Sequence, residues 1–131
     1  MQIQPRYTDV IAEISEFFRQ QFAHALGLDI DPMAIAFDPG IGFGKTPEHN
    51  LELLARLERL RVQDRALVVG VSRKSFLGKL TGSPEIKDRL IPGLVLTSLL
   101  RARGADVFRV HDIRENVYAL NVSEAILQRT K

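Results

Sequence analysis

The stretch Phe37-Asp38-Pro39-Gly40-Ile41-Gly42-Phe43-Gly44-Lys45-Thr46 places one carboxylate and three closely spaced glycines between an apolar run and a helix start. The preceding run, 33–37, is apolar at every position, which is typical of a strand buried on both faces. Glycines at alternate positions allow close approaches that side chains would block, so a flat ligand or an anion can lie against the main chain. Thr46-Pro47 supplies a cap and a first helical residue. The sequence therefore predicts strand, loop and helix, with Asp38 at the carboxyl end of the strand, where α/β folds keep their chemistry.

Two familiar phosphate-binding motifs do not fit this loop. A Walker A loop needs a glycine five positions before Gly44-Lys45-Thr46, and Pro39 occupies that position. A dinucleotide fingerprint reads G-x-G-x-x-G, whereas the glycines here read G-x-G-x-G. On these residues alone, a turn that only connects a strand to a helix remains an alternative.

The composition narrows the class of protein. The 131 residues are 45% apolar and 26% charged, which predicts one domain over 1–131 with an ordinary core. Basic residues outnumber acidic ones by only 18 to 16 and are scattered, so nucleic acid is not an expected partner. The sequence contains no run of about 18 apolar residues, so no membrane segment is expected. The absence of cysteine excludes a disulfide framework and thiol catalysis, and it fits a cytoplasmic location.

The strand-helix unit recurs along the chain. Apolar strands are expected at 33–37, 66–71 and 105–110, each followed by a polar loop. Amphipathic or capped helices are expected from about Thr8 or Asp9 to Gly27, from Thr46, from about Pro92 to Gly104, and from Glu115 to Gln128, with a flexible loop at 78–84. Short connections imply parallel strands with right-handed crossovers. The predicted fold class is therefore α/β.

Three parallel strands do not close a barrel, which needs eight strands and about 250 residues. The pattern of a leading helix followed by three βα units leaves two interpretations, a small open sandwich or a portion of a larger barrel. A chain that starts on a helix favours the second interpretation.

Each strand ends in residues that can carry chemistry. Asp38, Lys74, and Arg109 with His111 fall at equivalent places in successive units, so in a parallel sheet they converge on one rim. A carboxylate accepts hydrogen bonds from paired ring donors, and cations suit a carbonyl, a phosphate or a carboxylate. Arg109 and His111, two positions apart, project to the same side and can clamp an anion together. Taken singly, Asp38 could be a turn acid, Lys74 a solvated charge and Arg109 a surface ion pair.

Other polar residues are assigned no function. His24 and His49 lie at no metal-ligand spacing, and Lys45 and Arg73 are expected to be solvated charges. Asp112 is expected to cap the last helix.

Three motifs together resemble one enzyme family. Residues 37–46, then Val69-Gly70-Val71-Ser72-Arg73-Lys74-Ser75-Phe76-Leu77-Gly78, then Gly104-Ala105-Asp106 with Arg109-Val110-His111-Asp112, resemble dihydropteroate synthase, and the likeness runs along essentially the whole chain. The resemblance implies the C-terminal portion of a TIM (β/α)8 barrel. It also implies a transferase that condenses 6-hydroxymethyl-7,8-dihydropterin diphosphate with 4-aminobenzoate in folate biosynthesis, and that is a sulfonamide target.

The resemblance also implies roles for six residues. Asp38 would bind the amino-pyrimidine edge of the pterin, and Lys74 would contact the pterin with its stem near the aminobenzoate. Phe43 and Ser72 would form the aminobenzoate pocket. Arg109 and His111 would hold the diphosphate, so that Lys74, Arg109 and His111 carry the catalytic roles.

The family's first half, with an asparagine that helps to hold Mg2+ and diphosphate, has no counterpart here. We therefore expect Mg2+ for the whole enzyme, with no metal ligand in this chain, and either a homodimer or association with the missing half. Two alternatives stay open: a pterin-binding methyltransferase domain, which need not keep the S-R-K-S-F and R-V-H-D signatures, and a non-catalytic fragment that associates with itself.

Overall fold

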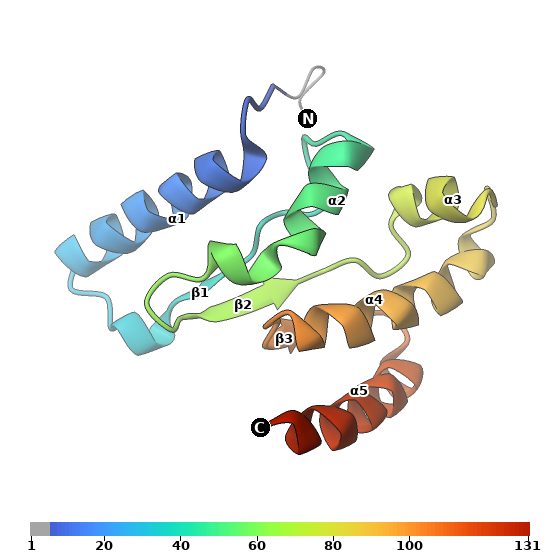
Figure 1. The fold of residues 1–131 in the computed structure, drawn as a ribbon. Helices are drawn as coiled ribbons and strands as arrows, with labels where there is room; N and C mark the ends of the chain where they lie inside the picture. The colour runs from blue at the N-terminus through green and yellow to red at the C-terminus, as the bar shows by residue number, and fades with distance from the viewer. Residues whose placement is uncertain (1–5) are drawn as a thin grey trace.

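Three βα units follow a leading helix in the structure, a computed structural model that describes residues 6–131 (Figure 1). The helices and strands are α1 (Val10–Gly27), β1 (Ala36–Phe37), α2 (Pro47–Ala55), β2 (Ala66–Val69), α3 (Ser75–Thr81), α4 (Leu90–Ala102), β3 (Val107–Phe108) and α5 (Ile113–Leu127). Single 3-10 turns lie at Pro32–Ala34 (η1), Leu57–Leu60 (η2), Ile86–Arg89 (η3) and Gln128–Thr130 (η4).

The three strands form a parallel sheet in the order β1-β2-β3. Ala36 pairs with Ala66 and Val68 pairs with Val107, so these four small or branched side chains share one face of the sheet. The opposite face carries the side chains that pack against the helices, namely Phe37, Leu67, Val69 and Phe108. The predicted α/β class with parallel strands is confirmed.

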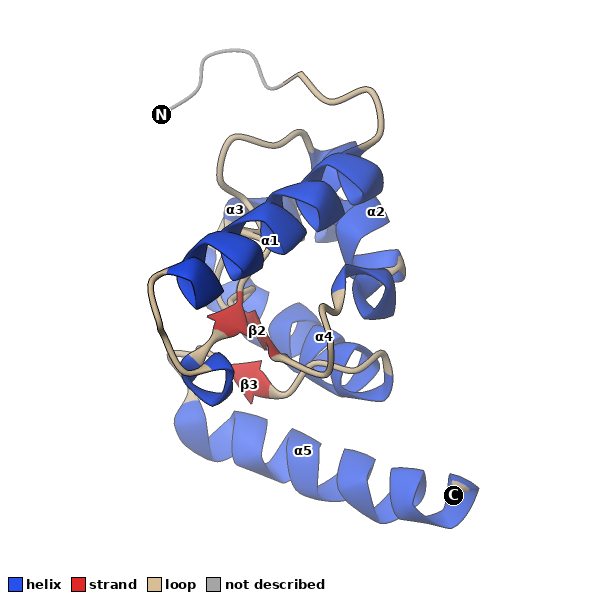
Figure 2. Ribbon diagram, turned by 90° about the vertical axis from the view of Figure 1, so that its left-hand side faces the viewer, coloured by secondary structure: helices blue, strands red, loops and turns tan. Residues whose placement is uncertain are grey.

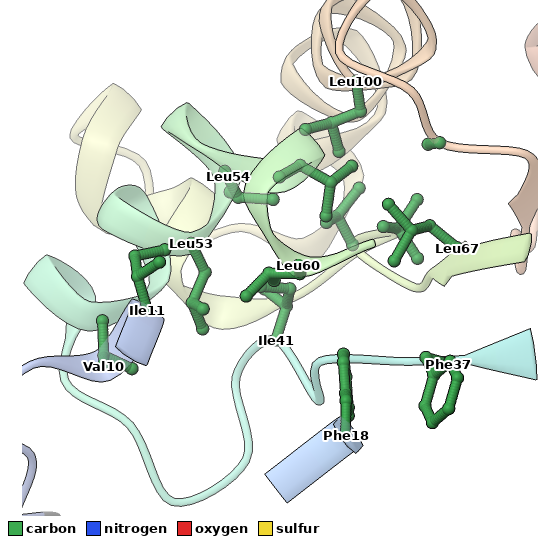
Figure 3. Close-up of a cluster of buried hydrophobic side chains, with 14 of the residues drawn as sticks. Val10, Ile11, Phe18, Phe37, Ile41, Leu53, Leu54, Leu60, Leu67 and Leu100 are labelled. Carbon is green, nitrogen blue, oxygen red and sulfur yellow. The ribbon is translucent and has the colours of Figure 1, made fainter. Parts of the chain in front are cut away.

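Helices line one side of the sheet and bury the face that carries Phe37, Leu67, Val69 and Phe108 (Figures 1 and 2). Ile41, Leu53, Leu60 and Leu67 are each 0% exposed and form the centre of the core (Figure 3). Leu57, also 0% exposed, belongs to the same cluster. The free energy from burying such a side chain is about 1.5–3 kcal/mol, so this cluster fixes α2 and η2 against β2. The glycine-rich loop contributes Ile41 to the core, and this buried side chain anchors the loop.

The helix starts follow the predicted signals. The Asp9 carboxylate accepts a hydrogen bond from the Ala12 amide at 3.0 Å and caps α1. Thr46 caps α2 through the His49 amide, and the His49 ring accepts from the Thr46 amide at 3.2 Å, which completes a capping box. His49 therefore has a structural task, as its lack of ligand spacing suggested.

Several expectations about local structure were wrong. The predicted strand at 33–37 is reduced to Ala36–Phe37, because the Asp31 carboxylate accepts from the Met33 amide and holds the preceding residues in a 3-10 turn. The other two strands also stop short of their predicted ends. Part of the loop expected at 78–84 is helix α3, which ends at Gly82 in the left-handed conformation. Asp112 occupies the cap position of α5, but its carboxylate binds Arg73 instead of a backbone amide.

One arginine ties β2 and β3 together at the amino end of the sheet. The Arg61 guanidinium donates to the carbonyls of Arg65 and Gly104 and to the Asp106 carboxylate, 3.0 Å away. Asp106 also accepts from the Leu67 amide at 2.9 Å. Burial raises the pKa of Asp106, but the hydrogen bonds from Leu67 and Arg61 outweigh burial and hold the pKa below its ordinary value.

The lowered pKa of Asp106 predicts how stability depends on pH. Its contribution is fully present above the ordinary aspartate pKa of about 3.9 and is lost as the pH falls through the lower pKa of the native state. Asp106→Asn should reduce the free energy of unfolding by about 1 kcal/mol at neutral pH and should flatten its decline below about pH 4. Urea unfolding from pH 2 to pH 7 measures both effects. Asp64→Asn, in an exposed turn at φ +62°, is the matched control; equal acid dependence in the two variants would contradict the assignment.

Candidate functional site

A hollow of about 250 Å3 opens at the carboxyl end of the sheet. The loops after β1, β2 and β3 all reach it, and its lining residues are Phe43, Gly70, Ser72, Lys74, Arg109, Val110 and His111. Five of the six side chains singled out from the sequence thus lie around one hollow. Asp38, the sixth, is exposed at the end of β1 and is not part of this lining. A larger open depression of about 630 Å3 lies between the starts of α1 and α2, and none of the six residues lines it.

The loop after β1 is shaped by its glycines and by two hydrogen bonds from its amides to side chains. Gly40, Gly42 and Gly44 have φ values of +69°, +85° and +60°, which side chains disfavour. The Asp38 carboxylate accepts from the Gly40 amide at 2.8 Å, and the Asn50 side chain accepts from the Gly42 amide at 2.9 Å. These bonds place Asp38 at a fixed position on the rim.

Lys45 is a structural part of the same loop, which corrects its assignment as a solvated charge. Its ammonium donates to the carbonyls of Gly40 and Phe43, both at 3.0 Å. Burial lowers its pKa, and the charge of Asp38 acts in the opposite direction. Asn50 was also missed; its only signal in the sequence was a polar residue beside the apolar positions of a helix.

Lys74 bridges the loops after β1 and β2. Its Nζ donates to the Ile41 carbonyl and lies 4.4 Å from the centre of the Phe43 ring, a cation–π distance. Its Cδ would be 3.1 Å from a Cβ added at Gly42, so a side chain there would crowd Lys74 in addition to straining the backbone. Burial lowers the pKa of Lys74, the charge of Asp38 opposes this effect, and the charges of Arg109 and Lys45 reinforce it. Lys74 therefore lies close enough to Asp38 for their charges to interact.

The Arg109 guanidinium lies close to the backbone at Gly70, the residue that follows β2. A Cβ added at Gly70 would be 3.0 Å from Arg109 Nη2 and 3.2 Å from its Nε, so the missing side chain of Gly70 makes room for the guanidinium. On the same rim, the Ser72 hydroxyl accepts from the His111 amide at 3.2 Å and lies 2.9 Å from Nδ1 of its ring. The arrangement presents two donors, an arginine and a histidine, to an anion in the hollow.

The described residues offer no preformed metal centre. Within 6–131, no group of three or more His, Cys, Asp or Glu side chains is placed to hold a metal ion. The donors around the hollow are mainly cationic or hydroxyl groups, and these do not suit Mg2+, which prefers carboxylate and carbonyl oxygen. No helix in the described part of the chain is long and apolar enough to cross a membrane.

A parallel sheet with helices on one side and charged side chains at its strand ends is the arrangement of α/β proteins, including barrel-type enzymes. The sequence matches the family described as "Pterin binding enzyme" over residues 1–111, and the chain belongs to this family.

Curated relatives share the sequence, and solved structures share both sequence and fold. Dihydropteroate synthase of Escherichia coli K12 is 40% identical over 127 residues, which are 97% of this chain and 45% of that protein. The Yersinia pestis enzyme, solved as a complex with a sulfonamide drug, superposes with a TM-score of 0.92 at 35% identity, covering 98% of this chain and 46% of that one. The Xanthomonas albilineans enzyme with 4-aminobenzoic acid gives a TM-score of 0.90 at 37% identity, covering 94% of this chain and 45% of that one. The chain therefore spans about half the length of the relatives it matches, and they confirm that its parallel units are those of part of a TIM barrel.

The closeness of Arg109 to Gly70 can be tested by substitution. Gly70→Ala should displace the guanidinium and weaken the binding of inorganic diphosphate about tenfold, because a charge-assisted hydrogen bond is lost. The free energy of unfolding should change little, since the atoms that must move are the end of a flexible side chain. Isothermal titration with diphosphate measures the affinity. Gly27→Ala, where an added Cβ meets nothing within 4 Å, is the control; equal affinities would contradict a role for Arg109 in anion binding.

Proposed function

We propose that this chain supplies the pterin, aminobenzoate and diphosphate contacts of a dihydropteroate synthase, the transferase of folate biosynthesis that joins a dihydropterin diphosphate to 4-aminobenzoate. The convergence of three strand ends on one hollow is the observation that carries the proposal. Two relatives support it, because the Xanthomonas albilineans structure holds 4-aminobenzoic acid and the Yersinia pestis structure a sulfonamide drug.

The six predicted residues take complementary roles in this proposal. The Asp38 carboxylate accepts hydrogen bonds from the amino-pyrimidine edge of the pterin. Lys74 contacts the pterin, while its stem, with Phe43 and Ser72, borders the aminobenzoate. The 4.4 Å contact between Lys74 and the Phe43 ring supports a shared pocket for the two substrates.

The chemistry requires stabilisation of a leaving group. The C–O bond between the pterin methylene and the diphosphate breaks, and the diphosphate departs with the electron pair. The Arg109 guanidinium and the His111 ring face this developing charge and lower the barrier. The amine of 4-aminobenzoate then attacks the electron-poor methylene and loses a proton. In this scheme the protein mainly positions the substrates and neutralises charge.

The partner of this chain is proposed to be further βα units that complete the barrel. The sheet leaves both edges, β1 and β3, without a neighbouring strand in the described residues. The inner face of the sheet, the one turned away from the helices, includes Val107, which is 48% exposed. Apolar surface and unpaired backbone therefore lie side by side. The missing half of the barrel, or a second copy of the chain in a homodimer, would cover this surface.

Other properties of the whole enzyme extend the same proposal. The Mg2+ ligand would come from outside this chain, in accordance with the donor set around the hollow. Sulfonamide sensitivity would follow from binding in the aminobenzoate pocket. The protein would be located in the cytoplasm, which agrees with its lack of cysteine and with a role in folate biosynthesis.

Two alternatives differ in what they bind. A pterin-binding methyltransferase domain would keep the pterin contacts, but it needs neither the Ser72–His111 pair nor the anion clamp. A non-catalytic, self-associating fragment would form a dimer without binding a pterin. The first is disfavoured by the geometry at Arg109 and His111.

Pterin binding is the direct test of the proposal. Asp38→Asn should weaken the binding of 6-hydroxymethyl-7,8-dihydropterin about 10- to 100-fold, because the carboxylate accepts charge-assisted hydrogen bonds that an amide cannot replace. Asp31→Asn, which alters only the cap of η1, should bind as the unmodified chain does. Fluorescence titration combined with solution mass gives both affinity and oligomeric state. A dimer that does not respond to pterin would support the non-catalytic alternative.

Turnover tests whether the chain suffices for catalysis. The polypeptide alone should release little or no diphosphate from the two substrates, because half the pocket and the expected metal ligand lie outside it. Steady-state release of diphosphate with the purified chain measures this. Turnover close to that of a complete barrel enzyme would show that the site is whole within these residues.

A further inference from the structure

The turn that carries Ser72 and Lys74 is built around a residue in a disfavoured conformation. Arg73 has φ +59°, in the left-handed region that costs a residue with a side chain about 1–2 kcal/mol. The Lys74 amide donates to the Val71 carbonyl at 3.2 Å and closes the turn. The free energy gained from one such hydrogen bond is about equal to the free energy lost to the strained conformation. The turn therefore depends on contacts from elsewhere in the fold.

Two contacts hold Arg73 in this conformation. Its guanidinium binds the Asp112 carboxylate with two hydrogen bonds, of 2.8 and 3.3 Å. Its carbonyl accepts a hydrogen bond of 2.8 Å from Nη1 of Arg89, at the start of α4. This carbonyl belongs to the peptide that joins Arg73 to Lys74, so the Arg89 contact fixes the direction in which the chain enters Lys74.

Arg89 is itself held in place between α3 and α4. Its Nε is buried and has no hydrogen-bond partner among the described residues. A Cβ added at Gly78 would lie 3.6 Å from this atom and 2.6 Å from the Ser83 carbonyl, so the guanidinium runs close beside α3. Arg89 also lines a small cavity of about 10 Å3 together with Ser72 and Asp112.

The stability of α4 does not explain an arginine at this position. Arg89 occupies the cap position of α4 and makes no capping hydrogen bond. A cation at the amino end of a helix is opposed by the helix dipole. Burial of an unpaired donor adds a further cost. The contact with the Arg73 carbonyl is the interaction that compensates for these costs.

Both neighbours of Arg73 reach the candidate site. Lys74 donates a hydrogen bond to the Ile41 carbonyl in the glycine-rich loop, and the Ser72 hydroxyl contacts the His111 ring. Rotation of the peptide between Arg73 and Lys74 would move Lys74 away from that loop. We propose that Arg89 is a positioning residue that holds this peptide, so that Lys74 and Ser72 face the same hollow. Its effect on pterin binding rests on the proposed function; its effect on Lys74 does not.

The titration of Lys74 reports its position directly. Burial lowers the pKa of this amine, and release from the glycine-rich loop would raise it toward the ordinary lysine value. Arg89→Met keeps an unbranched apolar stem and removes every donor, so it should raise the Lys74 pKa and weaken pterin binding about five- to tenfold. Arg89→Lys keeps one donor for the carbonyl and should retain the lowered pKa. NMR titration of the labelled lysine side chain measures the pKa.

Two further variants make the outcome decisive. Lys87→Met removes the same charge from the same turn, η3, and should leave the Lys74 pKa unchanged, which controls for long-range electrostatics. Asparagine adopts the left-handed conformation readily. Adding Arg73→Asn to Arg89→Met should therefore move the Lys74 pKa back toward its value in the unmodified chain, and should restore folding if Arg89→Met alone does not fold.

A Lys74 pKa that is the same in Arg89→Met as in the unmodified chain would overturn the proposal, as would failure of the added Arg73→Asn to restore either property. Absence of pterin binding by the unmodified chain would count against the proposed function alone, because the lysine titration needs no ligand.

Discussion

The parallel register of the three strands is the constraint on which the site depends. Because Ala36 pairs with Ala66 and Val68 with Val107, the strands end at one edge and release their loops toward one another. A shift of one residue in a strand would turn its helix-facing side chains to the other face, and the core would lose its contacts. The Arg61 clamp at the opposite end links β2 to β3, so register and site geometry are held by the same pairing.

The site combines rigid backbone with close packing of charges. Positive φ values at the glycines shape the first loop, and the absence of a side chain at Gly70 leaves space for Arg109. Positive charge gathers around Lys74, because the charges of Arg109 and Lys45 act on its amine in the same direction and that of Asp38 acts against them. Such an arrangement is unfavourable without a ligand and favourable with an anion, in keeping with the proposed diphosphate site.

The exposed inner face sets this chain apart from a self-contained sandwich. The helices bury one face of the sheet and leave the other face uncovered. In the described residues, the edge strands β1 and β3 each have one side free for strand pairing. The relatives it matches are about twice as long, which is consistent with further βα units around the same sheet. The interaction that completes the sheet would also complete the pocket, so assembly and activity would be coupled in the proposed enzyme.

Much of the architecture was determined by local sequence signals. Apolar runs, the Asp9 and Thr46 caps and the glycine spacing act over a few residues, so they predicted the unit order, the parallel sheet and the rim that carries Asp38, Lys74 and Arg109. The length of β1, the helix at Ser75–Thr81 and the partners of Lys45 and Asp112 were decided by the tertiary structure. The Asp112 carboxylate binds Arg73, 39 residues away in the chain, whereas β1 and Lys45 reflect competition between alternative local hydrogen bonds. Residue patterns do not encode such competition, because its outcome is set only when the folded chain brings the competing groups together.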